Sequence, residues 1–278
     1  KKEYGLAAFA VHQAKVYSLK MLLAVAEAII ANPPPSWSPS LVAAWRAIHA
    51  YLVFMGERKE AWTSSYEGDD NLLRSNFKWL DDDGNGLPMT REIISTRRNG
   101  HILQGLPGAS KCDRLGITWA NQKQHFRYDD SNPLSFAVAF QRWELAYPCP
   151  ADERTQWPAF SPSGDQQPFA PGVATATHSH LMIHALGAQE ATDLTIHSYR
   201  ASLINAMVVA KASGNAQFTE GIMQAHVRHK TLEAMYGYGK LQPRDYADNI
   251  AIITTTDPSG ARRDPSIEFD PASALESI

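Results

Sequence analysis

The residues best suited to chemistry gather in the last third of this chain. His197 and Arg200 stand three residues apart, a spacing that places both side chains on one face of a helix. A second histidine, His229, is followed nine residues later by Tyr238. The planar, always charged fork of an arginine can hold two phosphate oxygens, and a tyrosine hydroxyl can act as a nucleophile. These residue types favour attack on a phosphodiester.

Two basic residues upstream complete an ordered set. Arg58 follows Gly56 at the end of an apolar run, and Lys111 lies in a turn between short, aromatic-rich runs. The chain thereby resembles the tyrosine recombinases, the family of phage integrases and Cre-like enzymes, in which an arginine and a lysine precede His-x-x-Arg, a histidine or tryptophan, and a tyrosine nine positions on. The resemblance implies six catalytic residues: Arg58, Lys111, His197, Arg200, His229 and Tyr238.

The resemblance also implies a role for each group. The two arginines would clamp the scissile phosphate, and His229 would donate a further hydrogen bond. Tyr238 would attack and leave a 3′-phosphotyrosyl bond, while His197 assists its deprotonation and Lys111 protonates the leaving 5′ oxygen. That bond keeps the energy of the broken phosphodiester, so no metal, ATP or other cofactor is expected.

One departure and one ambiguity accompany the pattern. Ala61 stands where the family usually carries an acid that braces the first arginine, and the acidic residue falls at Glu60 instead. Tyr236 is a second tyrosine on the same predicted helix, ten residues after His226. The count of nine from His229 favours Tyr238, and the glycines at 237 and 239 would let its ring reach the phosphate.

Periodic apolar residues predict the elements that must hold these groups. Helices are expected over 16–31, over 38–55 with Ser38 as the cap, over 134–145, from His178 to 186, and from His197 to 210. Further helices are expected over 218–225 and from 231 onward. Short β-branched or aromatic runs predict strands at 77–79, 92–94 and 116–119. The expected fold is α+β, a mainly helical recombinase catalytic domain with a small antiparallel sheet at one edge.

The expected organisation is one catalytic domain over residues 1–242. A segment rich in proline and glycine at about 148–177 is interpreted as a surface insertion, and residues 243–278 as a tail that docks on another subunit or is partly disordered. The family's upstream core-binding domain is not expected within this chain. The implied partners are double-stranded DNA and three further copies, in a tetramer assembled from dimers on DNA.

Composition limits the classes of function. The formal charge of −3 excludes a uniformly basic surface, so a DNA-binding potential must be local. The two cysteines cannot build a disulfide framework, and no apolar run is long enough to cross a membrane. We therefore expect no membrane partner and a location inside the cell with its DNA, in the nucleus of a eukaryote or the cytoplasm or nucleoid of a bacterium.

The expected activity is site-specific DNA recombination or integration, as in mobile genetic elements. Three alternatives stay open. A type IB topoisomerase or telomere resolvase uses the same kinds of group, and a recombinase descendant can bind DNA without catalysis. A third alternative is a metallohydrolase built on the cluster of His178, His180 and His184, although no acid stands between the last two.

Overall fold

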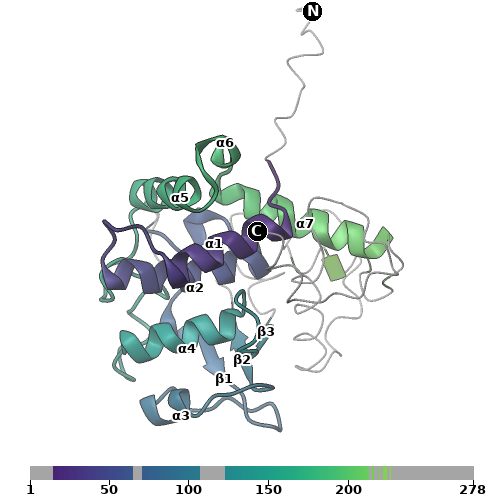
Figure 1. Cartoon of the computed structure of the whole chain (residues 1–278). Helices are drawn as coiled ribbons and strands as arrows, with labels where there is room; N and C mark the ends of the chain where they lie inside the picture. Colours follow the sequence, from purple (N-terminus) through teal and green to yellow (C-terminus); the bar gives the residue numbers. More distant parts are fainter. Residues whose placement is uncertain are drawn as a thin grey trace, which may run out of the picture.

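The computed structural model describes residues 15–64, 71–106 and 123–212, together with residues 215, 219, 222, 223 and 226. The described part is mainly helical with one small sheet, as Figure 1 shows, so the predicted α+β class is confirmed at this level. Its elements, in chain order, are α1 (Leu19–Ala31), α2 (Pro39–Met55), η2 (Lys59–Ala61), η3 (Arg74–Asn76), β1 (Phe77–Trp79), α3 (Arg91–Ser95), β2 (Ile102–Gly105), β3 (Gln124–Arg127), α4 (Phe136–Ala146), α5 (Pro171–Leu186), α6 (Ala188–Ala191) and α7 (Ile196–Ala212).

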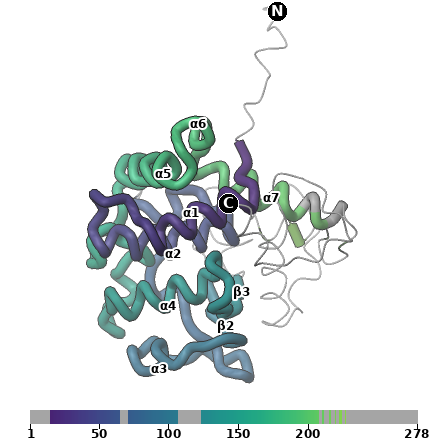
Figure 2. The backbone as a smooth tube through the Cα atoms, in the orientation of Figure 1, coloured from purple at the N-terminus to yellow at the C-terminus, as the bar shows by residue number. Residues whose placement is uncertain are grey.

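Helix α2 is the central element of the fold. The side chain of Ser38 caps its start by accepting a hydrogen bond from the Leu41 amide, as predicted, and Pro39 suits the first turn. From Ala44 to Met55 every residue except Arg46 is buried. A helix that is apolar on all sides must be covered on all sides. Accordingly α1, α4 and α7 all pack against α2, while α5 and α6 lie beyond α1 (Figures 1 and 2).

The three strands form an antiparallel sheet in the order β1-β2-β3. Its inner face carries aromatic side chains that meet α4, with ring centroids 4.7 Å apart for Phe77 and Phe140 and 4.8 Å apart for Phe126 and Phe136. Gly105 lies opposite Phe77, and a Cβ there would come within 3.0 Å of that ring. The sheet therefore joins α4 through one aromatic cluster.

One sequence prediction about this region is wrong. Residues 92–94 are not a strand, because α3 covers them and begins with the Thr90 side chain accepting a hydrogen bond from the Ile93 amide. The sheet takes its other two described strands from β2 and β3, which were not predicted, and the strand predicted over 116–119 lies outside the described residues.

The segment over 148–177 is not a surface insertion. Phe160 and Phe169 are fully buried in the core, and α5 begins inside the segment at Pro171. Arg154 fixes its first half by donating to both carboxylate oxygens of Glu144, each at 2.9 Å. Arg74, fully buried, lies 3.3 Å from the same carboxylate and stacks on Trp143. Two arginines that share one glutamate therefore hold the segment against α4.

The other helices agree with the sequence within a few residues at their ends. Helices α1, α4 and α7 correspond to the predicted helices over 16–31, 134–145 and 197–210, while α5 starts seven residues before the predicted His178. Among the described helices, none combines the length and the apolar character that a membrane crossing requires.

Candidate active site

The first predicted site residue, Arg58, stands in the turn that ends α2. Gly56 caps the helix in the left-handed conformation, with φ 52°, and its amide donates to the Leu52 carbonyl. The chain then passes through Glu57, which is buried, to Arg58, which is exposed and begins η2. A left-handed residue costs least when it is glycine, so Gly56 permits this sharp exit from the core.

The His-x-x-Arg pair lies in the first turns of α7, as predicted. His197 is exposed, whereas Arg200 is buried and donates from Nη1 to the Gly56 carbonyl at 3.4 Å. A Cβ built on Gly56 would stand 2.9 Å from the Arg200 Cα, so the two backbones meet with no room for a side chain between them. The turn that carries Arg58 and the helix that carries His197 are therefore in direct contact.

Buried hydrogen bonds fix the rotation of α7 about its axis. The His49 Nε2 bonds to the Leu22 carbonyl at 3.0 Å, so that nitrogen carries the proton. The other ring nitrogen, Nδ1, must then accept from the Tyr199 hydroxyl, 2.7 Å away. Tyr17 packs on the Tyr199 ring, with centroids 4.6 Å apart, and its backbone amide donates to Ser202. Because Tyr199 is anchored inward, its neighbours His197 and Arg200 are directed toward the α2 turn.

The imidazole of His197 lies within electrostatic reach of both predicted arginines. Burial lowers the pKa of its imidazole, and the positive charges of Arg200 and Arg58 lower it further, while Glu60 opposes them. A lowered pKa keeps the ring neutral near pH 7. His197 is thus able to accept a proton, or to donate a hydrogen bond, beside two guanidinium groups.

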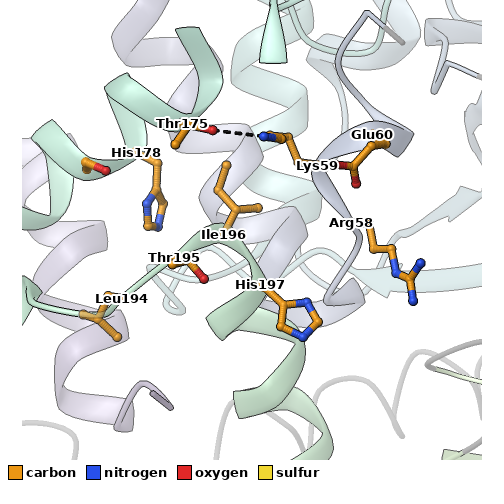
Figure 3. A pocket seen from close by; sticks show the side chains of 10 residues that line it. Arg58, Lys59, Glu60, Thr175, His178, Leu194, Thr195, Ile196 and His197 are labelled. Atoms are coloured by element: carbon orange, nitrogen blue, oxygen red, sulfur yellow. Dashed lines mark hydrogen bonds between the residues drawn. The ribbon is translucent and has the colours of Figure 1, made fainter. Parts of the chain in front are cut away.

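A pocket of about 320 Å³ adjoins this cluster. Figure 3 shows its walls, with Arg58 and Lys59 from the α2 turn, Thr175 and His178 from α5, and Thr195 to His197 from the start of α7. Lys59 donates to the Thr175 hydroxyl at 3.1 Å, which ties η2 to α5. Glu60 and the apolar Leu194 and Ile196 also line the pocket, so its cationic and hydroxyl side chains suit an anionic group on one part of the wall only.

His226 is a residue that the sequence prediction did not include. It is buried, its Nε2 bonds to the Phe54 carbonyl at 2.6 Å, and the charge of Arg200 contributes to lowering its pKa, after burial. The sequence held one signal for His226, because Tyr236 follows it by ten residues. The prediction chose His229 instead, because Tyr238 follows His229 by nine residues, as the family pattern requires. The described site therefore consists of Arg58, His197, Arg200 and His226.

Comparisons of the chain with protein-family models, with curated proteins and with solved structures found no match.

Three predicted site residues, Lys111, His229 and Tyr238, lie outside the described residues. Ala61, at the position of the expected acid, is half-buried and donates its amide to the Arg58 carbonyl at 3.0 Å. The acidic residue buried next to Arg58 is instead Glu57, while Glu60 is exposed.

The histidines of α5 have other partners than a metal. His178 bonds to the Tyr17 hydroxyl, His180 accepts from Trp37 Nε1 at 3.2 Å, and His184 bonds to the Asn32 carbonyl at 2.7 Å. Within the ranges that the structure describes, no group of three or more histidine, cysteine or acidic side chains is arranged to hold a metal ion. These contacts give α5 a structural use for all three histidines.

Proposed function

We propose that this chain is a tyrosine recombinase, which cleaves and rejoins DNA strands through a 3′-phosphotyrosyl intermediate. The observation that carries the proposal is the contact between Gly56 and Arg200, because it joins two motifs that lie far apart in sequence. The resemblance assigns Arg58 and Arg200 to the same task, and the positive charges of both lower the pKa of His197.

The chemistry proposed for the site follows from charge. In-line attack on a phosphodiester places extra negative charge on the non-bridging oxygens, and fixed guanidinium groups stabilise that charge without reorganisation. Removing such a donor costs about 10²-fold or more in rate. The neutral His197 would take part in moving the proton that the tyrosine hydroxyl, with an ordinary pKa of about 10, must lose. Lys111 would protonate the leaving oxygen.

The proposed nucleophile is Tyr238, and Tyr236 is its rival. His226 lies beside Arg200, and a count from His226 reaches Tyr236 after ten residues. A count from His229 reaches Tyr238 after nine. The two tyrosines would project about 200° apart on a helix, so only one of them can meet the phosphate.

A covalent trapping experiment tests the proposal. DNA sites bound by the full chain would be selected from a random duplex pool and rebuilt with a nick, so that the cleaved strand diffuses away and the adduct accumulates. We expect an adduct that survives denaturation, and peptide mapping should place it on Tyr238. Tyr238→Phe should abolish the adduct and Tyr236→Phe should keep it. An adduct on Tyr236 would show that Tyr236 is the nucleophile. The absence of an adduct on every selected site would refute the proposed recombinase activity.

Arginine variants separate chemistry from binding. Arg58→Ala and Arg200→Ala should lose adduct formation by about 10²-fold or more while DNA affinity changes far less, because many other phosphate contacts set affinity. Arg91→Ala is the matched control, since this exposed arginine lies on α3. Loss of affinity as steep as the loss of rate would contradict the clamp.

A further inference from the structure

A second hollow lies away from the site, where α1, α2 and α4 meet. It measures about 470 Å³ and is mainly apolar, and we call it the α2–α4 groove. Helix α2 contributes Pro39, Val42, Ala43 and Arg46, and α4 contributes Ala139, Arg142, Trp143 and Ala146. Both sets have the spacing i, i+3, i+4, i+7, so each is one continuous helix face. Two parallel-running faces beside each other form a trough of the shape that a third helix fills.

The end of the groove has the same apolar character. It is closed by four residues, Ile29, Ile30, Pro33 and Trp37. The side chain of Ile30 is 43% exposed, and few large apolar side chains in the described part are exposed to this degree. Small side chains at Ala43, Ala139 and Ala146 leave space between the larger walls. An apolar trough with small residues at its base is suited to the anchoring side chains of a helix.

The charge of the groove is unbalanced. Arg46 and Arg142 both line it, and none of its described lining residues is acidic. The buried Nε of Arg46 has no hydrogen-bond partner among the described residues. Burial, with a smaller contribution from the positive charge of Arg142, lowers the pKa of Arg46 to about 10. A carboxylate placed between the two guanidinium groups would offset their mutual repulsion.

We propose that the α2–α4 groove binds an amphipathic helix of a separate protein, which inserts aliphatic side chains between α2 and α4 and places a carboxylate against Arg46 and Arg142. DNA does not fit this groove, because its floor is apolar. The same face of a second copy does not fit either, since it would add two more arginines to the pair. The proposal is independent of the DNA chemistry proposed for the active site.

Three matched peptides test the charge requirement on the full chain. Each is a capped, alanine-based helix of fourteen residues with leucines at i, i+3, i+4 and i+7, flanked by glutamate, by glutamine or by lysine. Fluorescence anisotropy should show that the glutamate peptide binds about 10-fold or more tightly than the glutamine peptide, and that the lysine peptide binds weakest. Equal binding of the three peptides, or no binding of any, would overturn the proposal.

Variants of the chain locate the peptide. Arg46→Gln with Arg142→Gln should reduce binding of the glutamate peptide to the level of the glutamine peptide, and Arg91→Gln, on exposed α3, should leave it unchanged. Ala146→Phe fills the groove at an exposed position without altering charge, so it should weaken both peptides alike. Undiminished binding to the double arginine variant would place the peptide elsewhere and overturn the proposal.

One competing occupant belongs to the chain itself. Residues 264–278, outside the described residues, contain four acidic residues and no basic ones: Asp264, Glu268, Asp270 and Glu276. If this segment filled the groove, the glutamate peptide would bind only after Glu268→Gln and Asp270→Asn had been introduced. That result would overturn the assignment to a separate protein.

Discussion

Replacing Gly56 with alanine tests whether the contact between α2 and α7 builds the active site. The added methyl group would meet the Arg200 Cα at 2.9 Å and a Leu203 methyl at 3.1 Å. The first of these atoms belongs to the backbone, so α7 itself must move. Holding a residue other than glycine in the left-handed conformation costs about 1–2 kcal/mol. Overpacking adds about 1–3 kcal/mol, for a total loss of about 2–5 kcal/mol in the free energy of unfolding.

Gly100 provides the matched control. Its φ is 90°, also in the left-handed region, but a Cβ there meets no atom within 4 Å. Gly100→Ala should therefore cost only the conformational part, about 1–2 kcal/mol. Urea denaturation with unchanged m values would give both losses. Under conditions where both variants are folded, Gly56→Ala should also reduce adduct formation by about 10-fold or more, because small misplacements of positioned groups are costly.

Two results would refute this reasoning. Equal losses of stability in the two variants would mean that the added methyl group is accommodated and that α7 does not depend on the contact. Full adduct formation by Gly56→Ala, together with a large loss of stability, would mean that Arg200 does not need its observed position.

Three further predictions concern the interior. Glu144→Gln should lower the free energy of unfolding by about 3–5 kcal/mol, because Arg74 and Arg154 would lose their shared carboxylate. Calorimetry or urea denaturation measures this loss, and a loss below about 1 kcal/mol would contradict the prediction. Burial holds the pKa of His49 at about 4 and that of His178 at about 3, so both stay neutral in the folded chain while the unfolded chain takes up protons. The free energy of unfolding should therefore not depend on these two histidines above about pH 6.5. Below about pH 6.5 it should decrease as the pH is lowered, by up to about 1.4 kcal/mol per pH unit for each histidine. His178→Gln should make this dependence on pH less steep. Ser38→Ala should cost about 1 kcal/mol through loss of the α2 cap, measured by urea denaturation, whereas exposed Ser36→Ala should cost almost nothing.

Local signals predicted the helices better than the strands. Ser38 and the apolar run behind it sufficed for α2, since cap and periodicity agree there. At Ile93 and Ile94 the β-branched side chains favoured a strand, but the Thr90 cap and tertiary packing on α4 outweighed that preference. Strand β2 ends at Gly105, where the rings of Phe77 and Phe126 leave no room for a larger side chain. No sequence pattern reveals such a contact.

The residues of the candidate active site were predictable, and the way they assemble was not. The resemblance to the recombinase pattern pointed to Arg58, His197 and Arg200, and the structure places all three where α2 ends and α7 begins. His226 was not predicted as a site residue, because its position is set by a hydrogen bond to the Phe54 carbonyl near the C-terminal end of α2. The segment over 148–177, rich in proline and glycine, was interpreted as a surface insertion, yet its residues Phe160 and Phe169 are buried in the core. Long-range contacts of this kind are set by burial and not by local sequence.

The contact between α2 and α7 also has a consequence for the synthesis of the chain. Gly56 and Arg200 are separated by 144 positions, and Phe54 and His226 by 172. During translation, Arg58 leaves the ribosome long before its partners exist, because the N-terminal part of a chain is made first. A nascent chain interrupted before α7 emerges would lack His197, Arg200 and His226, so the cationic cluster could not assemble. The residues that would act on DNA thus come together only when most of the chain has been made.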